Sequence, residues 1–104
     1  MILVNTPTVP NQEIVAVHGI ARGSTVRSRN IGSDIFAGLK NIVGGEISEY
    51  TKLQADSREQ AMQRMTDDAL KMGANAIVNV RITTSVITQA SSEILAYGTA
   101  VTVK

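Results

Sequence analysis

The sequence predicts a single α+β domain in which two helices cover one face of a small antiparallel sheet, in the order β-α-α-β-β. Three observations predict this fold class. A segment rich in Val and Ile comes early, two stretches follow in which apolar residues recur at helical spacing, and two segments of alternating polarity close the chain. A chain of 104 residues has room for one compact domain and is too short for two, so we expect the domain to span residues 1–104.

The first strand is predicted over Glu13 to Ala21, EIVAVHGIA, because this run is apolar, rich in β-branched residues and too short for a helix. Alternate positions place Ile14, Ala16, His18 and Ile20 on one face and Val15, Val17 and Ala21 on the other. Neither face is polar, so both are expected to be covered. Residues 22–32, RGSTVRSRNIG, are predicted to form a loop, since Gly, Ser, Asn and three arginines interrupt the apolar pattern.

The first helix is predicted over residues 33–43. Ser33 suits the N-cap position, and Asp34 brings a negative charge to the first turn, where the helix dipole favours it. One apolar stripe follows, made of Ile35, Phe36, Leu39, Ile42 and Val43. The Gly44-Gly45 pair then predicts a corner. A phosphate-binding loop would follow a strand and end in a lysine, whereas these glycines follow a helix and precede Glu46.

The second helix is predicted over residues 47–72, a stretch without Gly or Pro that ends at Gly73. One face carries Tyr50, Leu53, Ser57, Ala61, Met65, Ala69 and Met72. Arg64 with Asp68 and Asp67 with Lys71 are spaced four apart on the exposed side. The run Ser57–Gln60 also fits a capping box, which would break the helix near Asp56. A continuous helix is the favoured prediction.

The last two strands are predicted over residues 76–88 and 93–103. In the first, AIVNVRITTSVIT, polarity alternates throughout, and in the second, EILAYGTAVTV, it alternates with Leu95, Tyr97, Val101 and Val103 on one side. The polar residues QASS between them predict a hairpin connection.

This arrangement leaves one face of the sheet without a helix. Three strands of about ten residues present on the order of 450 Å² on each face, and burying that area is worth about 10 kcal/mol before the entropy of association is subtracted. We therefore expect the chain to assemble with copies of itself. The apolar run MILV at the start of the chain is predicted to be an edge strand for a neighbouring subunit.

Composition excludes several classes of protein. Ten basic and nine acidic residues give a net charge of +1, so no strong overall field attracts nucleic acid or membranes. The absence of cysteine excludes disulfides, thiolate metal sites and cysteine nucleophiles. Three aromatic residues provide few stacking platforms for single-stranded nucleic acid. The N-terminus matches neither a signal peptide nor a membrane span, so a cytoplasmic location is expected.

Candidate catalytic groups are few. His18 is the one imidazole of the chain, and it lies in an apolar run that predicts a packed or interface position more strongly than a catalytic one. No HExxH or GxSxG spacing is present. We therefore expect no enzymatic activity. An enzyme whose sites form between subunits is a second alternative, since carboxylates of two chains could meet there.

Candidate ligand sites are of two kinds. Soft metal ions prefer sulfur, and the sulfur here is thioether sulfur, so the metal candidates are Met65, Met72 and His18. Methionines at helical spacing are more often core residues. The other candidate is an anion site formed by Arg22, Arg27 and Arg29, for which a solvated loop is the alternative.

Three segments of the chain resemble one known family. They are VRSRNIGSDIFAGLKNIVGGEISEYTKL, LKMGANAIVNVRI and YGTAV, which together span most of the chain. They resemble the YbjQ-like family of small bacterial proteins labelled as heavy-metal-binding. The resemblance implies a dodecin-like α+β subunit assembled as a homopentameric ring. It supplies no defined ligand motif, and the lack of cysteine and the single histidine weaken the metal label.

The function expected from the sequence is therefore that of a non-enzymatic, cytoplasmic homopentamer that acts as a binding module. Heavy-metal binding is its nominal activity through the resemblance, with a metal ion as the possible cofactor. The alternative is a ring that binds phosphate or an anionic small molecule.

Overall fold

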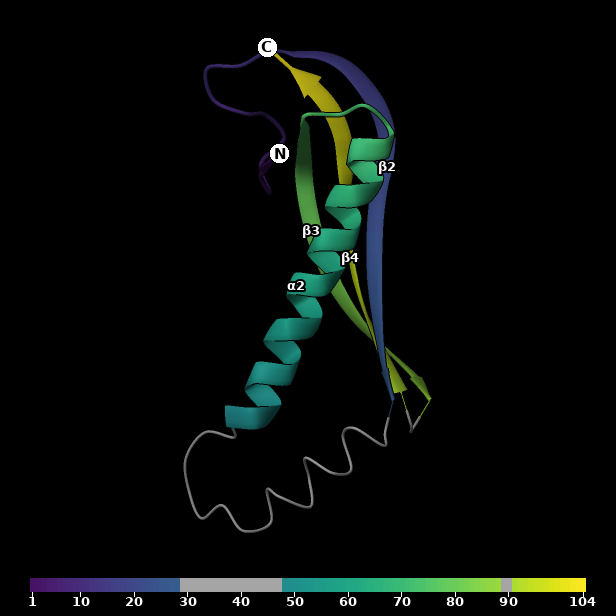
Figure 1. Ribbon diagram of the computed structural model, residues 1–104. Coiled ribbons are helices and arrows are strands. Elements are labelled where there is room, and N and C mark those ends of the chain that lie inside the picture. Colours follow the sequence, from purple (N-terminus) through teal and green to yellow (C-terminus); the bar gives the residue numbers. More distant parts are fainter. Residues whose placement is uncertain (29–47, 89–90) are drawn as a thin grey trace.

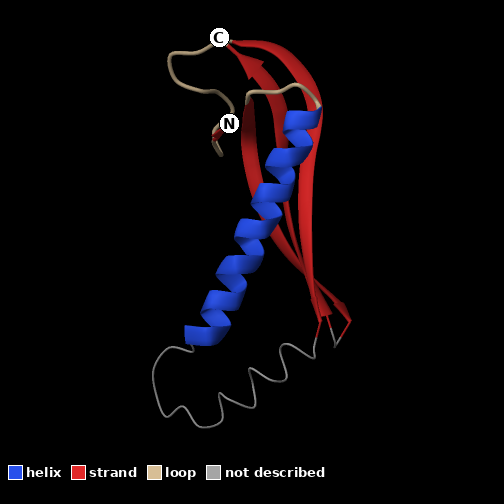
Figure 2. Ribbon diagram, in the orientation of Figure 1, coloured by secondary structure: helices blue, strands red, loops and turns tan. Residues whose placement is uncertain are grey.

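The computed structural model describes residues 1–28, 48–88 and 91–104. Its elements are β1 (Ile2–Leu3), β2 (Ile14–Ser28), α2 (Ser48–Lys71), β3 (Ala76–Thr88) and β4 (Ser91–Val103). The strands form one sheet in the order β1-β3-β4-β2, and α2 runs along one of its faces (Figures 1 and 2). The prediction of an α+β fold is confirmed. The predicted helix over residues 33–43 and the Gly44-Gly45 corner lie outside the described residues.

The sheet is mixed, so the prediction of a purely antiparallel sheet is wrong at one edge. β1 pairs with β3 in parallel, Ile2 opposite Ala76 and Leu3 opposite Ile77, whereas β2–β4 and β3–β4 are antiparallel. The MILV run is therefore an edge strand of its own sheet, where we predicted pairing with a neighbouring subunit. Backbone bonds from Ile2 N to Asn75 O and from Val4 N to Ile77 O fix it there.

β2 is much longer than predicted, because residues 22–28, for which we predicted a loop, continue the strand. The pairing with β4 runs from Ile14 opposite Val103 to Ser28 opposite Ser91. Pairing along a strand of 15 residues outweighs the local preference of Gly and Ser for a turn. Two register shifts, one on each side of Ala16 and Val17, also break the predicted alternation, so that Val17 and Ile20 share a face.

α2 is continuous from Ser48 to Lys71, as predicted, with no break near Asp56. The predicted buried face is confirmed at Ser57, Ala61, Met65 and Ala69, which are at most 1% exposed. Gly73 follows shortly after the helix end at Lys71 and adopts a positive φ of 87° that glycine reaches without strain. Figure 1 shows α2 close to β2 at the C-terminal end of the helix and diverging from the sheet toward its N-terminal end.

Small residues let the backbone of α2 approach β2 closely. Ala21, Ala61 and Ala69 are fully buried. Gly23 lies at the point of closest approach, where a Cβ would overlap backbone atoms of α2, including the carbonyl carbon of Arg64 at 2.7 Å. Two side chains of α2 also bind the outer edge of β2: Asp68 Oδ2 accepts the Arg22 N–H at 3.0 Å, and Arg64 Nη1 donates to Ser24 O at 2.6 Å. These bonds satisfy edge groups that a strand of another chain could otherwise pair with.

A bulge interrupts β3 at Asn79. This residue has a φ of 54°, a conformation that asparagine tolerates, and the register jumps from Val78 opposite Thr99 to Arg81 opposite Tyr97. The predicted unbroken alternation over residues 76–88 is therefore wrong at this point. The bulge is held by the N-terminal segment, since Asn79 N donates to Thr6 O at 3.0 Å.

The core has two parts, one on each face of the sheet. On the face that α2 covers, Met65 and Ile77 are the largest fully buried side chains of the first cluster. On the other face, Val9 from the N-terminal segment packs against Val78, Val101 and Val103. The N-terminal segment thus covers part of the face that has no helix. Among the described residues, no helix is long and apolar enough to cross a membrane.

Candidate functional site

His18 lies on β2 beside the last residues of β4. Its side chain is exposed, and its Nε2 lies 2.7 Å from Thr102 Oγ1. The partner that the structure gives this ring is a threonine hydroxyl of the neighbouring strand. His18 is therefore a surface residue that is hydrogen-bonded across the sheet.

The two methionine candidates lie in the core. Met65 is fully buried between α2 and the sheet, and Met72 is half-buried against the same cluster. Both side chains pack against apolar neighbours, which is the core role that methionine most often has. Among the side chains that the structure describes, in residues 1–26, 54–88 and 91–104, no three histidine or carboxylate groups lie close enough together to share a metal ion. The donors present in this part of the chain therefore do not fit a heavy-metal site.

The predicted arginine group is spread along the chain. Arg22 is exposed on β2 opposite Tyr97, and Arg27 occupies a position opposite Ser92 on the same strand. The ladder runs without a register shift between them, so positions 22 and 27, an odd number apart, belong to opposite faces of the sheet. Arg29 lies outside the described residues.

A different basic pair lies on the face away from α2. The register of β2 with β4 places Arg22 opposite Tyr97, and the register of β3 with β4 places Arg81 opposite the same tyrosine. These three residues, which we call the Arg-Tyr-Arg row, come from three adjacent strands. Sequence reasoning missed the row because Arg81 was considered only as a polar position in an alternating strand, and the bulge at Asn79 decides which face it occupies.

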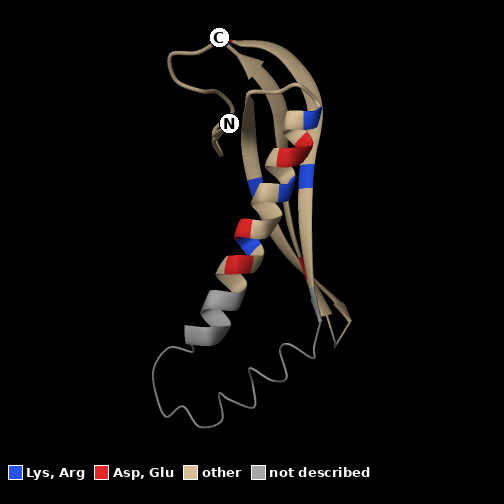
Figure 3. Cartoon of the chain, viewed as in Figure 1, with Lys and Arg blue, Asp and Glu red and all other residues tan. Residues whose placement is uncertain are grey.

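Charges elsewhere are concentrated on α2. Figure 3 shows acidic and basic residues alternating along this helix, while the described parts of the strands carry few charges. Of the helix carboxylates, Asp68 binds the edge of β2, and Asp67 accepts a bond from Gln63 at 3.0 Å. Neither forms a cluster with histidine.

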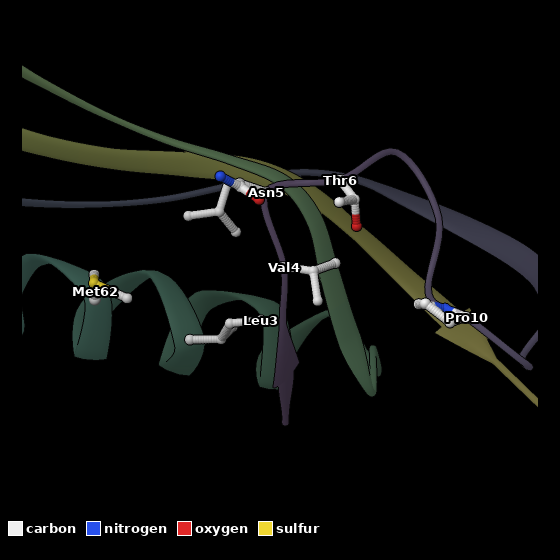
Figure 4. Close-up of a pocket in the computed structure, with 7 residues that line it drawn as sticks. Leu3, Val4, Asn5, Thr6, Pro10 and Met62 are labelled. Atoms are coloured by element: carbon white, nitrogen blue, oxygen red, sulfur yellow. The ribbon is translucent and has the colours of Figure 1, made fainter.

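A pocket of about 520 Å³ lies between the N-terminal segment, α2 and β3 (Figure 4). Apolar side chains such as Leu3, Met62 and Val80 line most of it, and Asn5 and Thr6 are its polar lining residues. A pocket of this lining can accept an apolar group, but it offers no acid, base or nucleophile beyond a threonine hydroxyl.

One family model and several relatives match nearly the whole chain. The model of the YbjQ_1 family, described as "Putative heavy-metal-binding", matches residues 1–104. A UPF0145 protein of Methanosarcina acetivorans is 50% identical over 101 residues, which cover 97% of this chain and 95% of the relative. A UPF0145 protein of Vibrio campbellii is 52% identical over 101 residues, 97% of each chain, and one of Pyrococcus furiosus is 50% identical over 104 residues, 100% of this chain and 91% of the relative.

A solved structure supports the fold. The crystal structure of a protein of unknown function from Pediococcus pentosaceus, assigned to the DUF74 family, superposes with a TM-score of 0.66 and covers 100% of this chain and 98% of that one. Its sequence identity of 11% makes this a likeness of fold alone.

Proposed function

Since the chain belongs to the YbjQ-like family, whose model it matches from end to end, we propose that it is a non-enzymatic binding module that assembles into a dodecin-like homopentameric ring in the cytoplasm. The ring and its dodecin-like subunit are what the family resemblance implies. The non-enzymatic role is proposed because the sequence contains no HExxH or GxSxG spacing.

One observation carries the proposal of assembly: large apolar side chains are exposed along the sheet. Val17, Ile20 and Val26 are 68%, 63% and 55% exposed, and Val86 is 80% exposed. Their registers place the first three on the face away from α2. Single exposed apolar residues are ordinary, but several on one strand form a surface that favours association.

The area available suits a second copy of this chain. Three strands of 13 to 15 residues present about 600 Å² on one face, of which the N-terminal segment covers part. The open remainder can supply much of the roughly 800 Å² that each partner contributes to a stable interface. The subunit is also extended, with a radius of gyration of 17.0 Å, against about 13 Å for a compact domain of 100 residues. An elongated subunit with exposed sheet surface gains most from neighbours of its own kind.

The test compares charged substitutions on two surfaces. We expect the wild-type protein to sediment as an oligomer and the Val17→Lys, Ile20→Lys double variant to sediment as a smaller species, because lysine at these exposed positions leaves the subunit folded and opposes burial. Leu70→Lys is the matched control, since Leu70 is 56% exposed on α2. A wild-type monomer, or equal dissociation by the control, would disprove the proposal.

Metal binding needs a separate measurement. Native mass spectrometry of protein isolated from its host reports the subunit count and any retained ion together. Stoichiometric metal that persists in Met65→Leu and Met72→Leu but is lost in His18→Ala would assign the ion to the histidine. We expect no stoichiometric metal on the described residues, because their donors do not converge.

A further inference from the structure

The Arg-Tyr-Arg row places two positive charges on either side of one aromatic ring. Arg22, Tyr97 and Arg81 are direct cross-strand partners, so they lie on the same face of the sheet. Adjacent strands lie about 4.8 Å apart, which puts the two arginine backbones about 10 Å from each other, with the tyrosine between them. Arginine side chains are long enough for both guanidinium groups to reach one ligand above the ring.

The carboxylate closest to the row is Asp68, which accepts the backbone N–H of Arg22 at 3.0 Å from the outer edge of the sheet. On the face of the row itself, no described carboxylate lies beside the two arginines. The neighbouring rows are uncharged and consist of Ile20, Thr99 and Val78 on one side and Ser24, Leu95 and Thr83 on the other. The nearest acidic residue of this face is Glu93, one row further, opposite Val26 and Ser85. The N-terminal residues 1–12 contain no acidic residue, and α2 lies across the opposite face. The row is therefore a local excess of positive charge in a nearly neutral chain.

The two guanidinium groups are positioned differently. Arg81 Nη1 donates to Asn5 O at 3.1 Å and to Val80 O at 3.0 Å, which holds its head at the margin of the N-terminal segment. The Arg22 side chain is exposed, and its guanidinium forms no hydrogen bond with the part of the chain that the structure describes. The Arg81 side chain is thus held in place by hydrogen bonds, and the Arg22 side chain can reorient to bind a ligand. Such a pair is suited to binding an anion.

We propose that the Arg-Tyr-Arg row binds a small aromatic phosphate, with the phosphate held by Arg22 and Arg81 and the ring stacked on Tyr97. Guanidinium groups match phosphate oxygens with paired hydrogen bonds. Tyr97 offers a ring face, and the half-buried Leu95 on the adjoining row extends the apolar floor. This site deepens the proposed binding function, since assembly that partly covers the face lowers the local dielectric and strengthens the attraction.

Calorimetric titration with phenyl phosphate tests the proposal. We expect saturable binding to the wild-type protein and at least tenfold weaker binding to Arg22→Gln and to Tyr97→Leu. Arg58→Gln is the matched control, because Arg58 is exposed on α2, and it should bind like the wild type. Inorganic phosphate should bind more weakly than phenyl phosphate, since it gains nothing from the ring. Arg81→Gln also loses the bonds to the N-terminal segment, so Arg22→Gln is the primary variant.

Four results would overturn the site: no binding of phenyl phosphate, equal affinity for inorganic phosphate, unchanged binding by Arg22→Gln, or equal weakening by Arg58→Gln. Sedimentation of the same samples separates this inference from the proposed assembly. A monomer that binds phenyl phosphate disproves the assembly and supports the site. An intact oligomer that does not bind it disproves the site alone. Dissociation by Arg22→Gln without phenyl phosphate binding would mean that a neighbouring subunit's carboxylate occupies the row, and it would also disprove the site.

Discussion

Gly23→Ala should strongly destabilise the fold, although alanine is ordinarily favoured over glycine in a strand by about 0.5–1 kcal/mol. The added Cβ would overlap the backbone nitrogen of Met65 and the backbone carbonyl oxygen of Ala61, and it would lie 2.7 Å from the carbonyl carbon of Arg64. These obstacles are backbone atoms of one helix turn, so no side-chain rotation relieves the overlap. α2 must move away from β2 as a unit.

The loss in free energy of unfolding follows from that movement of the helix. Carbon atoms meet without repulsion at about 3.5 Å, so the helix must shift by about 1 Å, which also loosens the packing of Met65 and Ala69. Overpacking of a core costs about 1–3 kcal/mol, and obstruction by backbone places this substitution near the upper value, at about 3 kcal/mol. At about 4–8 °C for each kcal/mol in a domain of this size, the melting temperature should fall by about 12–24 °C.

Urea unfolding followed by circular dichroism measures this change. Ser24→Ala is the matched control, since Ser24 is the next residue on the strand and its carbonyl, which accepts the Arg64 bond, is retained. The control should stay within about 0.5 kcal/mol of the wild type. If Gly23→Ala were as stable as the wild type or more stable, the close approach of α2 to β2 would be refuted.

Three further substitutions test other parts of the structure. Asp68→Ala removes the acceptor of the Arg22 N–H and should cost about 1 kcal/mol in urea unfolding, whereas Asp68→Asn, which keeps an acceptor oxygen, should cost less; equal stability of Asp68→Ala and wild type would contradict the edge contact. Met65→Ala empties a fully buried position and should cost about 3 kcal/mol, and a loss below 1 kcal/mol would mean that the site is not core. Asn75→Ala removes both side-chain bonds to Val103, at 2.8 and 2.9 Å, and should cost about 2 kcal/mol with faster amide exchange at Val103 N–H; unchanged exchange would contradict the pairing.

Local sequence patterns predicted the structure correctly where a helix or strand is determined by its own residues. The helical spacing of Ser57, Ala61, Met65 and Ala69 predicted the buried face of α2 because helical periodicity and burial coincide there. The limits of β3 followed from alternating polarity in the same way. The predicted N-cap at Ser33 and the predicted dipole interaction of Asp34 belong to residues 33–43, which lie outside the described residues.

Long-range contacts decided the features that the sequence did not predict. Gly23 resembles a loop glycine in its local context, and its role as the contact point with α2 depends on residues about 40 positions away. The bulge at Asn79 depends on the N-terminal segment, which supplies the acceptor Thr6 O. The same bulge sets the face of Arg81, so the Arg-Tyr-Arg row could be found only once the strand registers were known. Residue type was enough to name His18 and Met65 as candidate metal ligands. It could not show that His18 lies on the surface and that Met65 lies in the core.

Sedimentation equilibrium of the purified wild-type protein at micromolar concentration tests the central claim most directly. The subunit mass is 11.1 kDa. The exposed apolar surface of β2 and the extended shape of the subunit predict association, because burial of the open sheet face is favourable. The homopentameric ring that the family resemblance implies, and that we propose for this chain, would then appear as a single species of about five times that mass. A homogeneous species of 11.1 kDa across the concentration range would contradict the proposed assembly.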